Sequence, residues 1–208
     1  ESRTVEYALP VRRAEGQSYL SGVDEWHAAI TAIYEELFSQ ELGEDGIGAF
    51  LVWGDPMLYD STIRIIERVK ASGKVTFDFS VIPGITSVQA LCASHKIPLN
   101  LVGKPVAITT GRRLNEHFPG LIETAVVMLD GEQAFKAVEV PDAMIYWGAY
   151  LGTPDEIVIS GPVQAVKDRI LAARAEARER HGWIMDIYLL QKGTDFDDEA
   201  GSNSRKNV

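Results

Sequence analysis

Val52-Trp53-Gly54-Asp55-Pro56-Met57-Leu58-Tyr59-Asp60-Ser61-Thr62 is the stretch that decides the fold. The apolar run from Ala49 to Trp53 enters it and predicts a strand. Apolar residues at helical spacing, from Ile63 to Val69, leave it and predict a helix. In α/β proteins, ligands bind where a parallel strand ends and a helix begins. The stretch therefore predicts an α/β fold with a candidate binding turn after Trp53.

The residues of this turn suit that use. Gly54 has no Cβ, so another molecule can approach its backbone closely, and Pro56 stiffens the turn. Asp60 or Ser61 can cap the helix that follows. Asp55 is expected at the tip, as its ionised group. Taken alone, these residues are explained about equally well by a tight polar turn with no ligand.

Composition narrows the class of protein. The 208 residues are 46% hydrophobic and 24% charged, which is typical of a globular protein, and the longest apolar runs fall short of the ~18 residues of a membrane span. The net charge of −10 argues against nucleic acid as a partner. A single cysteine, Cys92, favours a reducing, cytoplasmic compartment. The four histidines show no metal-ligand spacing, so we predict no metal.

A second turn repeats the pattern of the first. The residues from Val75 to Ile82 alternate and predict a strand, after which Pro83-Gly84-Ile85-Thr86-Ser87 leads into another helix. Before the first turn we expect a weak strand over 1–10 and a helix that begins at Ser21 or Asp24. The first half of the chain therefore alternates strands and helices.

The second half is richer in strands. Lys96–Pro105 has the composition of a linker, and we expect a domain boundary near Gly103. This gives an N-terminal α/β lobe of 1–103, a C-terminal α/β lobe of 104–194 and a polar tail of 195–208. Helices are expected near Asn115, near Gln133 and over Val163–Arg180. The predicted strands of this half are Val106–Thr110, Thr124–Leu129, Ala143–Trp147, Ile157–Ser160 and Ile184–Leu190.

Four strings of residues together resemble a known family. They are Trp53–Thr62, Ile82–Gln89, Ala143–Tyr150 and Ser160-Gly161-Pro162. They are similar to the motifs of the tetrapyrrole (corrin and porphyrin) methylases, and the resemblance covers most of Phe50–Lys192. It implies a two-lobed α/β fold with S-adenosylmethionine in the cleft between the lobes, S-adenosylhomocysteine as product, a tetrapyrrole substrate and a homodimer. The fuller strings, with Thr109–Leu114 and Gly182–Asp186, resemble members that methylate a precorrin in aerobic cobalamin biosynthesis and release acetate.

The resemblance also implies which residues bind the cofactor. They are Gly54, Asp55, Leu58, Tyr59, Ile85, Thr86, Ser87, Trp147, Gly148, Ala149, Gly161 and Pro162. If the resemblance failed, Trp147 would be as well explained as a core aromatic. Family members normally open with a hydrophobic strand and a glycine-rich loop, which this sequence does not contain, and we expect an N-terminal segment to be missing.

Two arginines are the substrate-binding candidates. Arg112 and Arg113 follow a predicted strand, and arginine forks suit the carboxylates of a precorrin, although solvated loop charges are an equal alternative. The groups that handle protons in acetate release are candidates by residue type only: Asp55, Tyr59, His117 and Asp186. The competing functions are another methyltransferase of the same fold and a ligand-binding module without catalysis.

Overall fold

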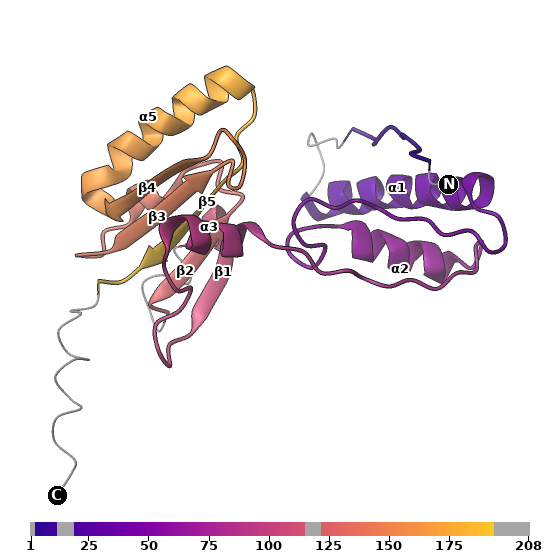
Figure 1. Ribbon diagram of the computed structural model, residues 1–208, viewed down its shortest axis with the longest axis horizontal. Coiled ribbons are helices and arrows are strands. Elements are labelled where there is room, and N and C mark those ends of the chain that lie inside the picture. Colours follow the sequence, from indigo (N-terminus) through magenta and orange to yellow (C-terminus); the bar gives the residue numbers. More distant parts are fainter. Residues whose placement is uncertain (1–2, 12–18, 115–121, 194–208) are drawn as a thin grey trace, which may run out of the picture. The chain divides into compact units, whose positions relative to one another are not determined.

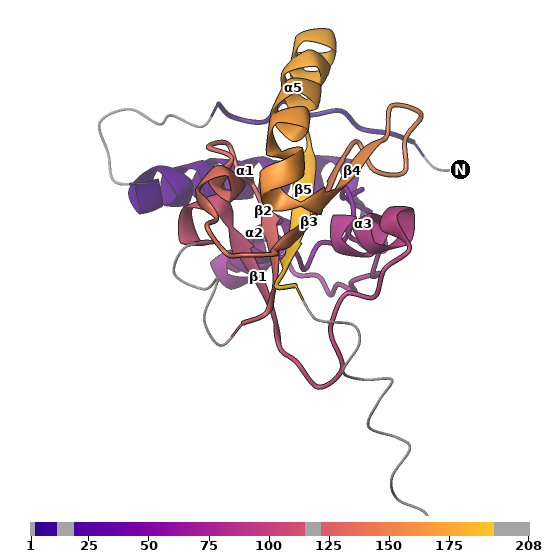
Figure 2. The same ribbon diagram turned by 90° about the vertical axis from the view of Figure 1, so that its left-hand side faces the viewer.

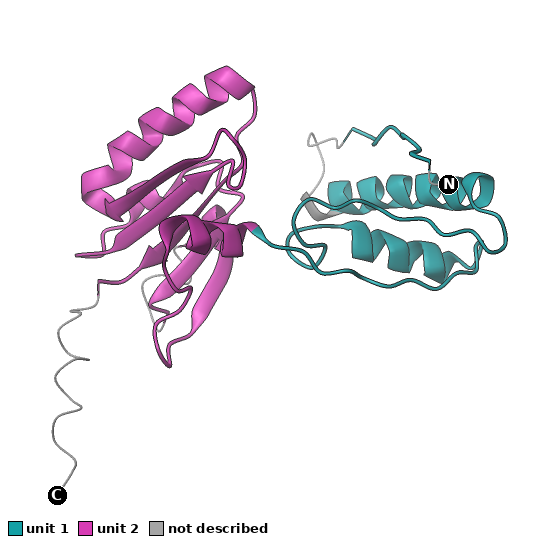
Figure 3. Cartoon of the chain, viewed as in Figure 1, with its two compact units in different colours: residues 1–86 teal, residues 87–208 magenta. Residues whose placement is uncertain are grey.

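The chain forms two compact units, Glu1–Thr86 and Ser87–Val208 (Figure 3). The computed structural model describes residues 3–11, 19–114 and 122–193. The boundary that the sequence predicts near Gly103 stays a prediction, as does the division into 1–103 and 104–194. The tail, 195–208, and the helix expected near Asn115 lie outside the described residues.

Two helices organise the first unit (Figure 1). α1 spans Tyr19–Glu41 and α2 spans Thr62–Ser72. Their facing side chains form a small apolar core, with the aromatic rings of Phe50, Phe77 and Phe79 packed against it. The centre of this core consists of Ile30, Tyr34, Ile65, Ile66 and Val69. Gly73 ends α2 in the left-handed conformation, with φ of 68°, which glycine adopts readily.

The strands predicted in the first unit do not form among its described residues. The segments 3–10, 49–53 and 75–82 run without a β-ladder. The prediction was wrong because alternation shows which side chains can be buried, whereas a strand also needs a hydrogen-bonded neighbour. The alternation nevertheless acts as expected, since Phe77 and Phe79 pack inward while Ile82 is 85% exposed.

The second unit contains a five-stranded sheet with the order β1-β2-β5-β3-β4. Its strands are β1 Val106–Thr110, β2 Thr124–Met128, β3 Met144–Ala149, β4 Ile157–Pro162 and β5 Asp186–Gln191. All five predicted strands are confirmed, with bounds shifted by up to two residues at either end. β1 and β2 are parallel, and β5 is antiparallel to both β2 and β3. Consequently β1, β2 and β3 run in the same direction, and their carboxyl ends share one edge of the sheet.

Helices cover both faces of this sheet (Figure 2). α5, Val163–His181, packs on the face that holds Ile145 and Trp147. α3, Ser87–His95, packs on the other face, where Leu91 meets Gly148. Short 3-10 turns follow β1 at Gly111–Arg113 and precede β3 at Ala134–Ala137, the second where a helix was expected near Gln133. In the part of the chain that the structure describes, no helix is both long and apolar enough to cross a membrane.

Candidate functional site

The two glycine turns singled out in the sequence lie against each other within the first unit. Gly54 adopts φ of 79°, a conformation that favours glycine. A Cβ on Gly84 would lie 2.1 Å from the carbonyl oxygen of Gly54. Only a residue without a side chain fits at position 84, because the atom in the way belongs to the backbone. The two turns, which are thirty residues apart in the sequence, therefore form one local structure, called here the joined turns (residues 53–59 and 83–86).

The carboxylate of Asp55 holds the joined turns together. Its Oδ1 accepts a hydrogen bond from the Met57 N–H and its Oδ2 accepts one from the Gly84 N–H, each at 2.8 Å. These two hydrogen bonds stabilise the ionised carboxylate, so the pKa of Asp55 lies below its ordinary value. The bond from the Gly84 N–H has the larger effect and the bond from the Met57 N–H the smaller. Asp55 is only 9% exposed, and its lowered pKa keeps it ionised at neutral pH, so the ionised group expected at the tip of the turn is a buried one. Two backbone donors draw the carboxylate inward, where it ties one turn to the other.

Further backbone contacts and a partly exposed tyrosine lie next to the Asp55 carboxylate. The missing Cβ of Gly54 faces the carbonyl oxygen of Ile85 at 3.6 Å and the Cα of Thr86 at 4.0 Å. The Leu58 N–H donates to the Asp55 carbonyl at 3.2 Å. Tyr59, with φ of 54°, is 45% exposed, and partial burial raises the pKa of its phenol. The structure thus brings together six of the predicted cofactor residues: Gly54, Asp55, Leu58, Tyr59, Ile85 and Thr86. Ser87, the seventh along the chain, begins α3.

In the second unit, one edge of the sheet collects another part of the predicted site. Arg112 and Arg113 are exposed and lie in the 3-10 turn directly after β1. Gly148 and Ala149 end β3, which runs in the same direction. Three strand spacings separate the ends of β1 and β3, which corresponds to about 14 Å. The arginines and the end of β3 therefore lie along the same edge of the sheet.

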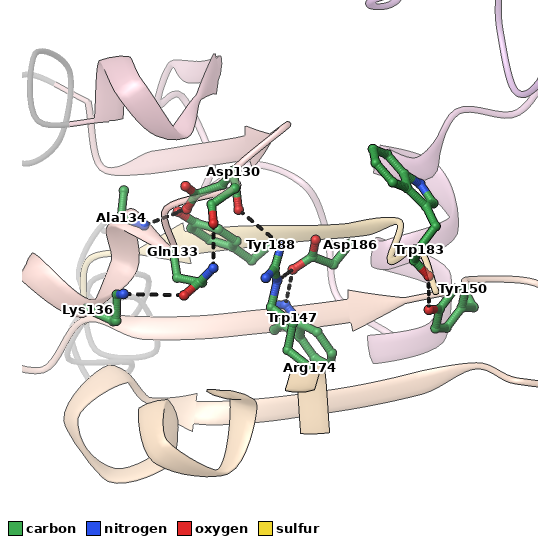
Figure 4. Close-up of polar contacts among 11 residues, drawn as sticks. Asp130, Gln133, Ala134, Lys136, Trp147, Tyr150, Arg174, Trp183, Asp186 and Tyr188 are labelled. Carbon is green, nitrogen blue, oxygen red and sulfur yellow. Dashed lines mark hydrogen bonds and ion pairs between the residues drawn. The ribbon is translucent and has the colours of Figure 1, made fainter. Parts of the chain in front are cut away.

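Trp147 belongs to the core of the second unit. Its side chain is fully buried, and its Nε1 donates to Asp186 Oδ2 at 3.0 Å. Arg174 of α5 donates to the same oxygen at 2.9 Å (Figure 4). Both members of this ion pair are about one-tenth exposed, at 11% for Arg174 and 10% for Asp186. Asp186, a candidate for proton handling, thus has its carboxylate engaged in a structural ion pair.

Gly161 and Pro162 lie at the opposite edge of the sheet from Ala149. β4 is antiparallel to β3, and Gly161 pairs with Ile145 while Pro162 pairs with Met144. A Cβ on Gly161 would lie 2.7 Å from Val166 Cγ1, so this glycine permits close packing of α5 on β4. The second-unit residues predicted to bind the cofactor are therefore divided between two edges and the core. Their assignment stays a prediction.

Two polar pairs could not be expected from the sequence. His27 of α1 lies 2.9 Å, Nε2 to Oγ, from Ser61 at the start of α2. Tyr188 donates to Asp130 Oδ2 at 2.6 Å, and the Ala134 N–H donates to the same oxygen (Figure 4). The partners are 34 and 58 residues apart, and a lone histidine on an apolar helix face gives no signal of its partner.

His117, a third candidate for proton handling, lies outside the described residues.

A metal site would need several His, Cys, Asp or Glu side chains close together. Among the residues that the structure describes, no group of three or more such side chains is placed to hold a metal ion. The prediction that the protein uses no metal stays a prediction.

Comparisons with known proteins agree with these features. The family model described as Tetrapyrrole (Corrin/Porphyrin) Methylases matches residues 7–167. A curated relative from Sinorhizobium sp, "Precorrin-6A synthase [deacetylating]", is 74% identical over 198 residues, which cover 95% of this chain and 76% of the relative.

Two solved structures of related proteins align with this chain. A protein from Corynebacterium diphtheriae, described as related to cobalamin synthesis, aligns with a TM-score of 0.77 and 41% identity over 83% of this chain and 73% of that one. A uroporphyrin-III-C-methyltransferase from Thermus thermophilus aligns with a TM-score of 0.56 and 24% identity, over 79% of this chain and 68% of that one. At this identity the second similarity shows the fold alone.

Proposed function

The chain belongs to the tetrapyrrole (corrin/porphyrin) methylases, and on that premise we propose that it is an S-adenosylmethionine-dependent C-methyltransferase of aerobic cobalamin biosynthesis. Its substrate is precorrin-5, which it methylates at C1 with release of acetate to give precorrin-6A. The main support for the reaction is the 74% identical relative, whose name states both the precorrin product and the deacetylation. The observation that supports the site is the pair of joined turns, built around Gly54, Asp55 and Gly84.

The joined turns fit the cofactor in two respects. Gly54 leaves the backbone of Ile85 and Thr86 uncovered by a side chain of its own, so a ligand can reach main-chain donors and acceptors there. Ile85, which is 74% exposed, and Met57, which is 71% exposed, add apolar surface beside them. S-adenosylmethionine supplies the methyl group as a sulfonium. The contribution of these residues is to bind and orient it, because positioning provides much of the rate of an in-line displacement.

Asp55 acts indirectly in this proposal. Its carboxylate is committed to the Met57 and Gly84 amides, so it shapes the turn that receives the cofactor. Gly148 and Ala149, at the end of β3, are proposed as the second unit's contribution, together with the backbone of Trp147. Ser87, Gly161 and Pro162 complete the predicted set. We also propose that the enzyme is a cytoplasmic homodimer, in keeping with its family.

Binding of the substrate requires local positive charge. Precorrins carry many carboxylates, and a protein of net charge −10 repels them at long range. Arg112 and Arg113 are exposed side by side after β1, at an edge of the sheet where ligands commonly bind. We assign them the role of holding precorrin carboxylates through paired N–H donors.

Replacing Arg112 and Arg113 together with Gln is expected to raise the KM for precorrin-5 by about 5- to 30-fold. Each partly exposed charge pair contributes roughly 0.5–1 kcal/mol, and two are lost. Affinity for S-adenosylhomocysteine should stay within about twofold of the wild type. Steady-state kinetics and calorimetry measure the two quantities.

The matched control replaces Arg169 and Arg178, which are exposed on α5, with Gln. It should leave the KM for precorrin-5 unchanged. An unchanged KM in the Arg112/Arg113 variant would show that these arginines are only solvated loop charges. A lowered melting temperature with weaker binding of both ligands would assign them a structural role instead.

Turnover tests the proposed function itself. Incubation with precorrin-5 and S-adenosylmethionine should yield S-adenosylhomocysteine and acetate in equal amounts. Transfer to a different tetrapyrrole, with precorrin-5 inert, would favour another methyltransferase of this fold. Binding of S-adenosylhomocysteine without any turnover would favour a ligand-binding module.

A further inference from the structure

The hydrogen bond between His27 and Ser61 places an imidazole against a hydroxyl beside the joined turns. The distance from His27 Nε2 to Ser61 Oγ is 2.9 Å. The imidazole is buried, with His27 only 6% exposed, whereas Ser61 is half-buried. Ser61 follows Tyr59 by two residues, so its hydroxyl lies close in sequence to the proposed cofactor site. A histidine within hydrogen-bond reach of a serine hydroxyl is the arrangement that activates serine as a nucleophile.

The hydroxyl of Ser61 does not cap α2. Ser61 occupies the N-cap position, where serine usually accepts a hydrogen bond from the first turn of the helix, yet its side chain makes no such bond. Asp60 satisfies the first turn instead, since its Oδ1 accepts the Thr62 N–H at 2.6 Å. The Ser61 hydroxyl is therefore oriented by the imidazole of His27 rather than by the helix backbone.

The proposed reaction requires an acyl acceptor, and three of the groups suggested by the sequence, Asp55, Asp186 and Tyr59, are poorly suited to help. Asp55 is bound to two backbone N–H groups, and Asp186 is bound to Arg174 and Trp147. The raised pKa of Tyr59 keeps its phenol protonated at neutral pH. None of the three is bonded to a hydroxyl in the way that His27 is.

We propose that Ser61 accepts the acetyl group from precorrin-5 and that His27 is its general base. This inference rests on the proposed function. The inference adds to the proposed function a site for the deacetylation, which methyl transfer does not explain. That site is a serine–histidine pair of the first unit.

The Ser61 Oγ attacks the acetyl carbonyl carbon, and its proton passes to His27 Nε2. The bond between the acetyl carbon and the ring carbon then breaks, and its electron pair stays on the ring carbon, where the conjugated macrocycle delocalises it. That electron pair makes the ring carbon the nucleophile that methyl transfer needs. Water hydrolyses the acetyl-serine ester, which yields acetic acid, restores the serine hydroxyl and leaves the proton on His27 for release to solvent.

Three variants test the pair. Ser61→Ala is expected to slow acetate release from precorrin-5 by on the order of 10³-fold or more, and His27→Gln by on the order of 10²-fold or more. Ser61→Cys keeps a nucleophile at the position and should retain part of the activity. The matched control is Ser72→Ala, which removes a hydroxyl from the far end of α2 and should release acetate at the wild-type rate.

Rapid quenching provides a readout that a structural role would not change. Wild-type enzyme mixed with precorrin-5 without S-adenosylmethionine should carry one added acetyl group on Ser61, detected by mass spectrometry of the peptide. Ser61→Ala should carry none, while its melting temperature and its affinity for S-adenosylhomocysteine match those of Ser72→Ala.

The outcomes separate the inference from the proposed function. If wild-type enzyme converts precorrin-5 and Ser61→Ala does so at a similar rate, the inference is overturned while the proposed function stands. The inference is also overturned if Ser61→Ala is inactive and has a lowered melting temperature, while Ser61→Cys has the wild-type melting temperature and still releases no acetate. If the wild type releases no acetate from precorrin-5, both fail.

Discussion

Replacing Arg174 with Met should lower the free energy of unfolding of the second unit by about 3–5 kcal/mol. The guanidinium of Arg174 faces the carboxylate of Asp186, and both side chains are about nine-tenths buried. Removing the cation leaves Asp186 buried with only the Trp147 N–H as its partner among these groups (Figure 4). An uncompensated buried carboxylate is costly, so the loss exceeds the net stabilisation that the ion pair itself provides. Urea unfolding followed by circular dichroism measures the free energy of unfolding of both proteins.

The control for this prediction is Arg178→Met, one helical turn further along α5. Arg178 is exposed, and the variant should lie within about 0.5 kcal/mol of the wild type. Adding Asp186→Asn to Arg174→Met should recover part of the lost stability, because the amide carries no charge to compensate. Equal stability of the Arg174 and Arg178 variants would contradict this account of the second unit's core.

Replacing Gly84 with Ala should disrupt the joined turns and lower kcat/KM about 100-fold. The new Cβ would lie 2.1 Å from the Gly54 carbonyl oxygen, a backbone atom that cannot rotate away. One turn must then move, and displacement of a binding element by about 1 Å can cost about 100-fold in rate. The same clash should lower the free energy of unfolding by about 3 kcal/mol, at the upper end of the usual cost of overpacking.

Gly43→Ala is the matched control in the same unit. No atom lies within 4 Å of its added Cβ, so neither kcat/KM nor stability should change appreciably. Calorimetry of Gly84→Ala with S-adenosylhomocysteine should show weaker binding than the wild type. A Gly84→Ala enzyme with wild-type affinity and turnover would remove the joined turns from the site.

Local sequence patterns predicted much of the fold. The helical spacing of apolar residues from Ile63 to Val69 predicted α2, and five apolar segments of the second half predicted the five strands of the second unit. The helix predicted over Val163–Arg180 is confirmed as α5, which spans Val163–His181. Each of these features depends on a few neighbouring residues. Alternation, helical spacing and the placement of glycine or proline within such a short segment are enough to predict it.

Contacts between distant segments could not be predicted in this way. The burial of Asp55 depends on the Gly84 N–H, and the environment of Ser61 depends on His27. Each pair comes from different elements, so neither leaves a periodic signal. The pairing of strands is also a contact between distant segments. The apolar run 49–53 and the alternating segment 75–82 both predict strands, but their residues alone do not specify a hydrogen-bonded neighbour.

The most direct test of the central claim is one reaction followed by nuclear magnetic resonance. The enzyme is incubated with precorrin-5 and S-adenosylmethionine labelled with ¹³C in its methyl group. The account predicts that the label appears on C1 of the macrocycle, with one equivalent each of acetate and S-adenosylhomocysteine. Label on any other carbon, or methyl transfer without acetate, would contradict it.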